Sequence, residues 1–140
     1  MSETWGVVGG GMLGMVLALR LAQAGKKVLL IDTDLRRPRV HQYLGLGNRF
    51  GLSDLFLGHG KLADVTQIYE GPNNTHFEVV TTGAIPPNPG ELLSSERMRA
   101  LMAEAAESAG VVIIDSAPSL VADSQAISAN ADGVIMVVES

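Results

Sequence analysis

The chain has 140 residues, of which 46% are hydrophobic and 18% charged, and this composition suits one globular domain with an adequate core. Its formal net charge of −5 disfavours nucleic acid and anionic membranes as partners, because both require a basic protein surface. The sequence contains no cysteine, which excludes disulfides, thiolate nucleophiles and thiolate metal sites and agrees with a reducing, cytoplasmic location.

The first elements predicted are a strand over residues 4–8, a glycine turn and a helix over residues 12–24. Gly9, Gly11 and Gly14 have G-x-G-x-x-G spacing between the strand and the helix. In such a turn, the absence of a Cβ at Gly11 lets the backbone approach a pyrophosphate, and the helix N-terminus offers free N–H groups to the anion. The pattern indicates a phosphate-binding turn; a structural turn that serves only strand-to-helix packing is the alternative.

Residues 28–31 form the next predicted strand, and Asp32 ends it. Four successive apolar residues without alternation are typical of a parallel strand that is buried on both faces. The loop that follows, residues 32–39, carries Asp34 and three arginines. It lies at the carboxyl end of a strand, where open α/β sheets bind ligands, although a solvated loop would have the same composition.

The rest of the chain continues the alternation of strands and helices. We predict short helices over residues 52–57 and 62–69, a strand over 77–82, an extended proline-rich loop over 85–89 and a helix over 91–108. A strand over 111–114 then ends in Asp115, a helix covers 120–130, and a last strand covers 133–138. This alternation predicts a three-layer, doubly wound parallel α/β sheet of the Rossmann or P-loop type, with about five strands.

From about Leu21 onward, the sequence resembles the cytoplasmic P-loop domain of bacterial tyrosine kinases that control capsule and exopolysaccharide synthesis. The matching segments are AQAGKKVLLIDTDLRRP, GLSDLFLG, IPPNPGELLSSERMRAL and VVIIDSAPSLVADSQAI. The resemblance implies that Asp32 and Asp34 belong to a second Walker motif and that Asp115 is the Walker B acid. Carboxylates at these strand ends would bind the Mg²⁺ of a nucleotide and orient the accepting hydroxyl.

That family also has a Walker A loop, G-x-x-x-x-G-K-[ST], before its first helix, and here the sequence departs from it. Gly10 and Gly11 stand where the lysine and the Ser or Thr would be, and no lysine precedes Lys26. The positive charge for the β- and γ-phosphates and the hydroxyl ligand for Mg²⁺ are therefore absent from this loop. On this ground we predict that the protein is not an enzyme, that it has no catalytic residues, and that Mg²⁺ is not its cofactor.

Residues 5–25 look instead like the N-terminus of FAD-dependent amine-oxidase or protoporphyrinogen-oxidase-like flavoproteins, through the segments GVVGGGMLGM and LALRLAQAG. In those proteins an acid at the end of the second strand, here Asp32, holds the ribose. We interpret the chain as an engineered, recombinant chimera that forms a single α/β domain over 1–140, with a Rossmann-like segment over 1–25 and a P-loop-kinase-like body over 26–140. A divergent natural kinase-like protein is the alternative.

The function predicted from these patterns is weak binding of a dinucleotide, FAD or NAD, without kinase activity. The candidate cofactor-binding residues are Gly9, Gly10, Gly11, Met12, Gly14 and Asp32. Asp34 and Asp115 would be metal ligands only if a Mg²⁺-nucleotide binds. Two alternatives stay open, namely a folded scaffold without a ligand, and residual Mg²⁺-nucleotide binding or ATPase activity.

The order of the strands separates the two resemblances. A Rossmann sheet has the order 3-2-1-4-5, whereas the kinase resemblance implies 3-2-4-1-5, with the strand of Asp115 between the first two. Because every strand after the first comes from the kinase-like body, we expect 3-2-4-1-5, with 3-2-1-4-5 as the alternative. In the expected order Asp115 lies next to the glycine turn, and Asp32 lies one strand spacing, about 5 Å, further away.

Overall fold

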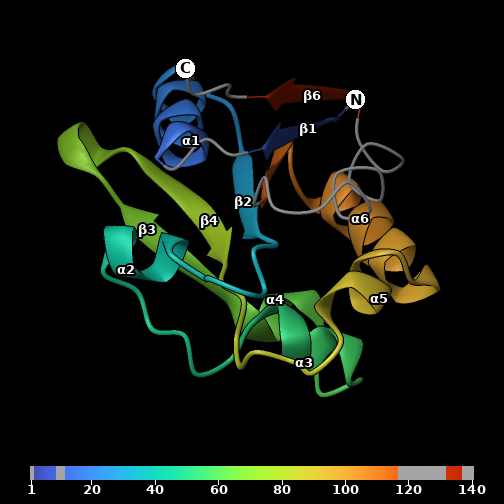
Figure 1. The fold of residues 1–140 in the computed structure, drawn as a ribbon. Coiled ribbons are helices and arrows are strands. Elements are labelled where there is room, and N and C mark those ends of the chain that lie inside the picture. The colour runs from blue at the N-terminus through green and yellow to red at the C-terminus, as the bar shows by residue number, and fades with distance from the viewer. Residues whose placement is uncertain (1, 9–11, 117–131, 137–140) are drawn as a thin grey trace.

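The structure is a computed structural model that describes residues 2–8, 12–116 and 132–136. Figure 1 shows its elements along the chain. The helices and strands are β1 (Glu3–Val8), α1 (Leu13–Gln23), β2 (Val28–Asp32), α2 (Val40–Leu44), α3 (Leu52–Phe56), α4 (Leu62–Val65), β3 (Thr66–Glu70), β4 (His76–Val80), α5 (Pro89–Leu93), α6 (Glu96–Ser108), β5 (Val111–Ser116) and β6 (Gly133–Met136).

The strands form one sheet in the order β3-β4-β2-β5-β1-β6. Neighbouring strands are parallel from β4 to β6, and β3 pairs antiparallel with β4 at one edge. The five predicted strands 1 to 5 correspond to β1, β2, β4, β5 and β6. In that numbering the parallel part of the sheet has the order 3-2-4-1-5, so the predicted order is confirmed and the Rossmann order is excluded. Its decisive feature is that β5 lies between β1 and β2.

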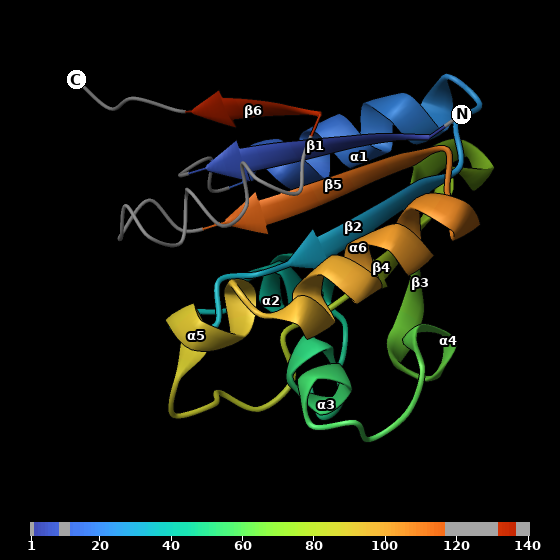
Figure 2. The same ribbon diagram turned by 90° about the vertical axis from the view of Figure 1, so that its right-hand side faces the viewer.

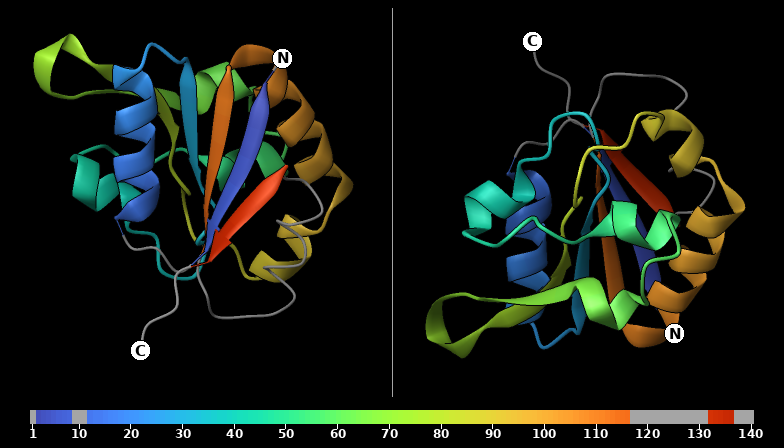
Figure 3. Two further views of the ribbon diagram at one scale, coloured as in Figure 1. Left: turned by 90° about the horizontal axis from the view of Figure 1, so that it is seen from above. Right: turned by 90° about the horizontal axis from the view of Figure 1, so that it is seen from below.

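Helices cover both faces of the sheet, as Figure 3 shows with α1 on one side and α6 on the other. Val28 and Leu30 of β2 pack in one apolar cluster with residues of α1, whereas Leu29 and Ile31 pack in a second cluster with residues of α6. All four side chains are at most 2% exposed. The predicted three-layer α/β fold is therefore confirmed, and the double burial explains why this strand has no polar alternation.

The predicted helix over residues 62–69 is wrong beyond its first turn. Helix α4 ends at Val65, and the chain continues directly into the edge strand β3. Strand β3 joins β4 through a tight turn in which Asn73 and Asn74 have φ of 59° and 60°, and the Thr75 N–H donates to the Pro72 carbonyl at 3.1 Å. This is the geometry of a type I′ hairpin turn, in which asparagine is favoured at both positions with positive φ.

The predicted helix over residues 91–108 is in fact two helices, because Ser95 interrupts it. Ser95 has extended backbone angles, and its Oγ accepts a hydrogen bond from the Met98 N–H at 3.3 Å, so it begins α6 as an N-cap. The expected helix over 120–130 lies outside the described residues. Among the helices that the structure describes, none is long and apolar enough to cross a membrane.

Candidate functional site

Two aspartates face each other across the carboxyl ends of β2 and β5. Asp32 and Asp115 are register partners in this parallel pair, and each follows a run of buried aliphatic residues. Figure 2 shows β1, β5 and β2 running side by side in the same direction, so that their carboxyl ends meet at one edge of the sheet. Open α/β sheets bind ligands at this edge.

Asp32 is fully buried and organises the loop that follows β2. Its Oδ1 accepts the Asp34 N–H at 2.9 Å, and its Oδ2 accepts the Val40 N–H at 3.3 Å. Asp34, which is half-buried, accepts the Arg37 N–H through its own Oδ1 at 3.0 Å. These bonds fold the loop back over the end of the strand, so that its acidic and basic residues are held at the same edge.

The carboxyl groups of Asp32 and Asp115 both have pKa values above the usual value for aspartate. Burial raises the pKa of Asp32 from 3.8 to about 7, although the N–H groups of Asp34 and Val40 favour the charged form. Burial, followed by the negative charges of Asp32 and Asp34, raises the pKa of Asp115 from 3.8 to about 8. Within the described residues no cationic side chain forms an ion pair with Asp32 or Asp115. A bound cation would supply the missing positive charge.

Asp115 also contacts the beginning of α1. A Cβ added at Gly14 would lie 3.5 Å from the Cγ and Oδ1 of Asp115, an ordinary van der Waals distance. The N-cap residue of α1 is Met12, which is 55% exposed and makes no side-chain capping bond, and the first turn of α1 has no acidic residue. The N–H groups of this turn are thus available to an anion beside the Asp115 carboxylate.

Thr33 joins the two strand ends that carry the aspartates, a structural role that the sequence analysis did not identify. Its N–H and its Oγ1 both donate to the Asp115 carbonyl, at 2.8 and 2.9 Å, which ties the end of β2 to the end of β5. Its position between two aspartates after a buried strand was the available signal. The pairing itself depends on β5 lying next to β2, which a local pattern does not reveal.

The structure brings together only part of the predicted dinucleotide site. Gly9, Gly10 and Gly11 lie outside the described residues. Met12 and Gly14 stand at the start of α1 near Asp115, whereas β5 separates Asp32 from β1. Both carboxylate oxygens of Asp32 also accept hydrogen bonds from backbone N–H groups. These contacts hold Asp32 to the loop after β2, with one strand between it and β1.

The acids alone do not form a complete metal site. Among the described residues there is no group of three or more His, Cys, Asp or Glu side chains that could hold a metal ion. Mg²⁺ usually takes one or two carboxylates and completes its octahedron with water and substrate phosphates. The carboxylates at the ends of β2 and β5 therefore suit a magnesium ion that arrives together with a phosphate.

Comparison with known protein families gives a match on the N-terminal part of the chain. The model described as an NAD(P)-binding Rossmann-like domain matches residues 7–37. This stretch contains the glycine turn, α1, β2 and the loop after β2, and it agrees with the Rossmann-like pattern in the sequence. It covers less than a quarter of the chain.

Comparison over the whole length gives a different class of protein. The chain is 46% identical over 125 residues to the tyrosine-protein kinase YwqD of Bacillus subtilis, a match that covers 89% of this chain and 52% of that protein. The kinase domain of Escherichia coli tyrosine kinase ETK superposes with a TM-score of 0.88 at 32% identity, over 97% of this chain and 55% of that one. The chain thus spans about half the length of these relatives and is similar to their P-loop kinase domains.

These findings contradict three predictions made from the sequence. Weak dinucleotide binding without kinase activity, and the absence of enzyme function, are both contradicted by the kinases to which most of the chain is similar. FAD or NAD without Mg²⁺ as the cofactor is contradicted as well, because the proteins to which most of the chain is similar are kinases. The error lay in giving one glycine turn more weight than the strand order, which decides what stands beside that turn.

Proposed function

We propose that this chain binds a magnesium-nucleotide, ATP, at the edge of the sheet formed by Asp32 and Asp115, and that it takes part in phosphoryl transfer as a P-loop kinase or ATPase. The observation that carries the proposal is the in-register pair of Asp32, which is buried, and Asp115, which is partly buried, beside the first turn of α1. The similarity to the kinase domain of ETK supports it, because that similarity covers 97% of the chain.

In this proposal Asp115 and Asp34 bind the Mg²⁺, directly or through water, and Asp32 fixes the loop that carries Asp34. The phosphates lie on the glycine turn that contains Gly9, Gly10, Gly11, Met12 and Gly14, where the N–H groups of α1 face them. Mg²⁺ would neutralise charge that develops on the transferred phosphoryl group. It also removes the repulsion between the carboxylates and the phosphates.

The glycine turn lacks a lysine, so other positive charge has to meet the β- and γ-phosphates. The loop after β2 supplies it in this proposal, because Arg36, Arg37 and Arg39 are exposed at the same edge of the sheet. Arginine forms a bidentate pair with phosphate and keeps its charge at every physiological pH. Arg37 is the best placed of the three by its backbone, which Asp34 fixes.

Calorimetric titration of ATP tests the proposal directly. We expect saturable binding with Mg²⁺, weaker binding with excess EDTA, and a loss of about tenfold or more in affinity for Asp115→Asn, because a charge-assisted metal contact is removed. Glu107→Gln is the matched control, since it removes one exposed carboxylate on α6 and should bind as the wild type does. Binding that is indifferent to both EDTA and Asp115→Asn would refute a magnesium-nucleotide site at this edge.

We also propose that the chain joins a Rossmann-like segment, residues 1–25, to a P-loop-kinase-like body, residues 26–140, in one α/β domain. Two observations bear on this origin. The Rossmann-like family model matches at the N-terminus and stops at residue 37. The kinase relative is similar over 125 residues, yet the sequence has Gly10 and Gly11 where a Walker A loop has its lysine and hydroxyl residue.

A further inference from the structure

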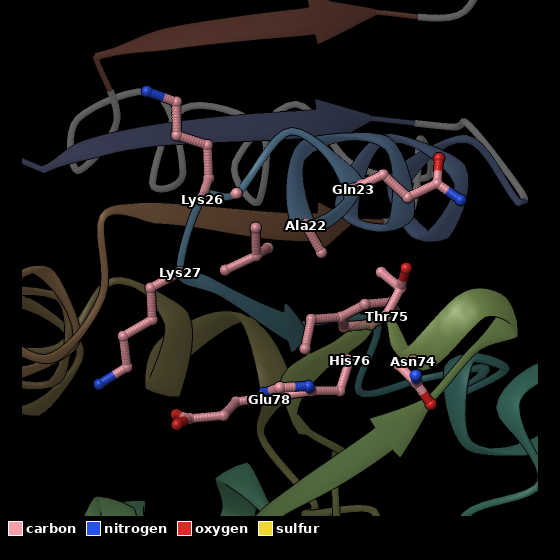
Figure 4. A pocket seen from close by; sticks show the side chains of 11 residues that line it. Ala22, Gln23, Lys26, Lys27, Asn74, Thr75, His76 and Glu78 are labelled. Atoms are coloured by element: carbon pink, nitrogen blue, oxygen red, sulfur yellow. The ribbon is translucent and has the colours of Figure 1, made fainter.

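A hollow of about 440 Å³ lies at the opposite end of the sheet from Asp32 and Asp115, where β2 and β4 begin (Figure 4). The last turn of α1, the turn that leads into β2, and residues 74–78 of the β3–β4 hairpin line it. A second hollow of about 190 Å³ shares Asn74, Thr75 and His76 with it. The volume of the larger hollow falls within the range of small-molecule binding pockets, which is about 300–1,000 Å³.

The hollow has an apolar floor and a polar rim. Val28 and Phe77, each 2% exposed, contribute to the floor together with Ala22. The polar side chains of its lining are those of Gln23, Lys26, Lys27, Asn74, Thr75, His76 and Glu78. Figure 4 shows Lys26 and Lys27 on the turn after α1, with their side chains extended away from each other, and Asn74, Thr75, His76 and Glu78 on the hairpin. A ligand here would have an apolar part and a polar head.

The charge of the rim indicates which head group fits. Two of the chain's three lysines, Lys26 and Lys27, stand here on a protein whose formal net charge is −5. Both are exposed, and within the described residues neither forms an ion pair. Glu78 is the one acid among the lining residues. The rim is therefore locally cationic, and it offers His76 and Asn74 as further hydrogen-bond donors.

We propose that this hollow binds a small phosphate monoester that carries an apolar group. The phosphate lies at the rim beside His76, where a change of side-chain rotamer brings the exposed Lys26 or Lys27 to it, and the apolar group lies against Ala22, Val28 and Phe77. A phosphate monoester has up to two negative charges and three acceptor oxygens. It can therefore bind two ammonium groups and the neighbouring hydrogen-bond donors, whereas a carboxylate ligand has one charge and two oxygens. This site is separate from the proposed nucleotide site, because β2 runs its whole length of five residues between them.

The test is a titration of the ¹⁵N-labelled full chain with phenyl phosphate, followed by amide chemical shifts. We expect saturable shifts at Gly25, Thr75 and His76, with weaker binding of inorganic phosphate, which has no apolar group, and of benzoate, which carries a carboxylate instead. Lys27→Met should weaken phenyl phosphate binding about fivefold or more, because it removes a charge-assisted contact. Lys61→Met is the matched control, since it makes the same substitution at the one lysine that does not line the hollow.

Four results would overturn the proposal. Shifts that appear only around Gly14, Thr33 and Asp115 would place phenyl phosphate at the carboxyl edge of the sheet instead. Equal weakening by Lys27→Met and Lys61→Met would mean that only the overall charge matters. Benzoate binding as tightly as phenyl phosphate would show that the rim does not select a phosphate, and the absence of any saturable shift would show that it binds none of these anions.

Discussion

The carboxyl groups of Asp32 and Asp115 lie next to each other on the paired strands β2 and β5, where little solvent reaches them. Such a pair is costly when both groups are charged and no cation is near, because burial removes hydration and like charges repel. The raised pKa values of about 7 and about 8 express that cost. An edge of the sheet that is destabilised when empty and ionised is well suited to bind a divalent cation, which relieves both effects.

The pKa values predict how the free protein responds to pH. The folded protein keeps protons on Asp32 and Asp115 that the unfolded chain releases above about pH 4, so the free energy of unfolding should fall as pH rises from about 4 to about 8. Asp115→Asn cannot ionise and should escape part of this loss. Without Mg²⁺ we expect it to be about 1–3 kcal/mol more stable than the wild type at pH 8.5, and no more stable below pH 4.

Urea unfolding at the two pH values measures this difference, with Glu107→Gln as a control that changes an exposed carboxylate. A stability gain for Asp115→Asn that is the same at both pH values would contradict the prediction, since a pH-independent gain has no connection with ionisation. Added Mg²⁺ at pH 8.5 should stabilise the wild type more than the variant, because only the wild type retains both carboxylates.

Individual acids of the site could be predicted from the sequence, but their arrangement could not. Asp32, Asp34 and Asp115 stand directly after buried strands, and that position alone places them at the ligand-binding edge of a parallel sheet. The bonds from Thr33 to the Asp115 carbonyl, and from the Val40 N–H to Asp32, join segments that are distant in sequence or separated by a loop. Local patterns carry no information about such pairs.

The turn between β1 and α1 departs from the Walker A pattern G-x-x-x-x-G-K-[ST]. Gly10 and Gly11 occupy the positions of the Walker A lysine and hydroxyl residue. Helix α1 follows this turn and has no side-chain N-cap. Its first turn lies next to Asp115. In the proposed function, this uncapped helix start and Asp115 would serve a phosphate beside a turn without the Walker A lysine and hydroxyl residue.

Restoring these two side chains should raise turnover of ATP. For the double variant Gly10→Lys, Gly11→Ser we expect an increase of about 100-fold in the rate of ADP formation with Mg²⁺, because a lysine would stabilise charge on the phosphates and a hydroxyl would bind the metal. A coupled assay of ADP release measures it. Gly10→Met, Gly11→Ser is the control of equal length without charge. An equal gain in both variants would show that the positive charge is not the missing component.

Short elements were harder to predict than long ones for a physical reason. Residues 62–69 have helical spacing, yet Thr66, Ile68 and Tyr69 favour an extended chain once β4 offers a partner. The type I′ turn at Asn73 and Asn74 fixes that pairing. By contrast, the buried strands β2 and β5 were predicted within a residue or two, because burial on both faces leaves a continuous apolar run.

The strand order connects the fold to the site. With β5 between β1 and β2, the acid next to the start of α1 is Asp115, whereas the Rossmann order would have placed Asp32 there. The order could be predicted from the resemblance of the chain after residue 25 to a P-loop body, and not from the glycine turn. The match of residues 7–37 to a Rossmann-like model therefore describes a local pattern within a sheet of different connectivity.

A central strand with both faces covered should be sensitive to truncation on either side. Ile113 and Ile114 of β5 are both fully buried and belong to the two different apolar clusters, one against α1 and one against α6. We expect Ile113→Ala and Ile114→Ala each to lower the free energy of unfolding by about 2–5 kcal/mol, with an unchanged urea m-value. Ile68→Ala, at a position that is 60% exposed on the edge strand β3, should change it by less than about 0.5 kcal/mol. If only one of the two central substitutions is destabilising, then helices on one face alone hold the sheet in solution, and the three-layer packing that positions Asp115 against α1 would be wrong.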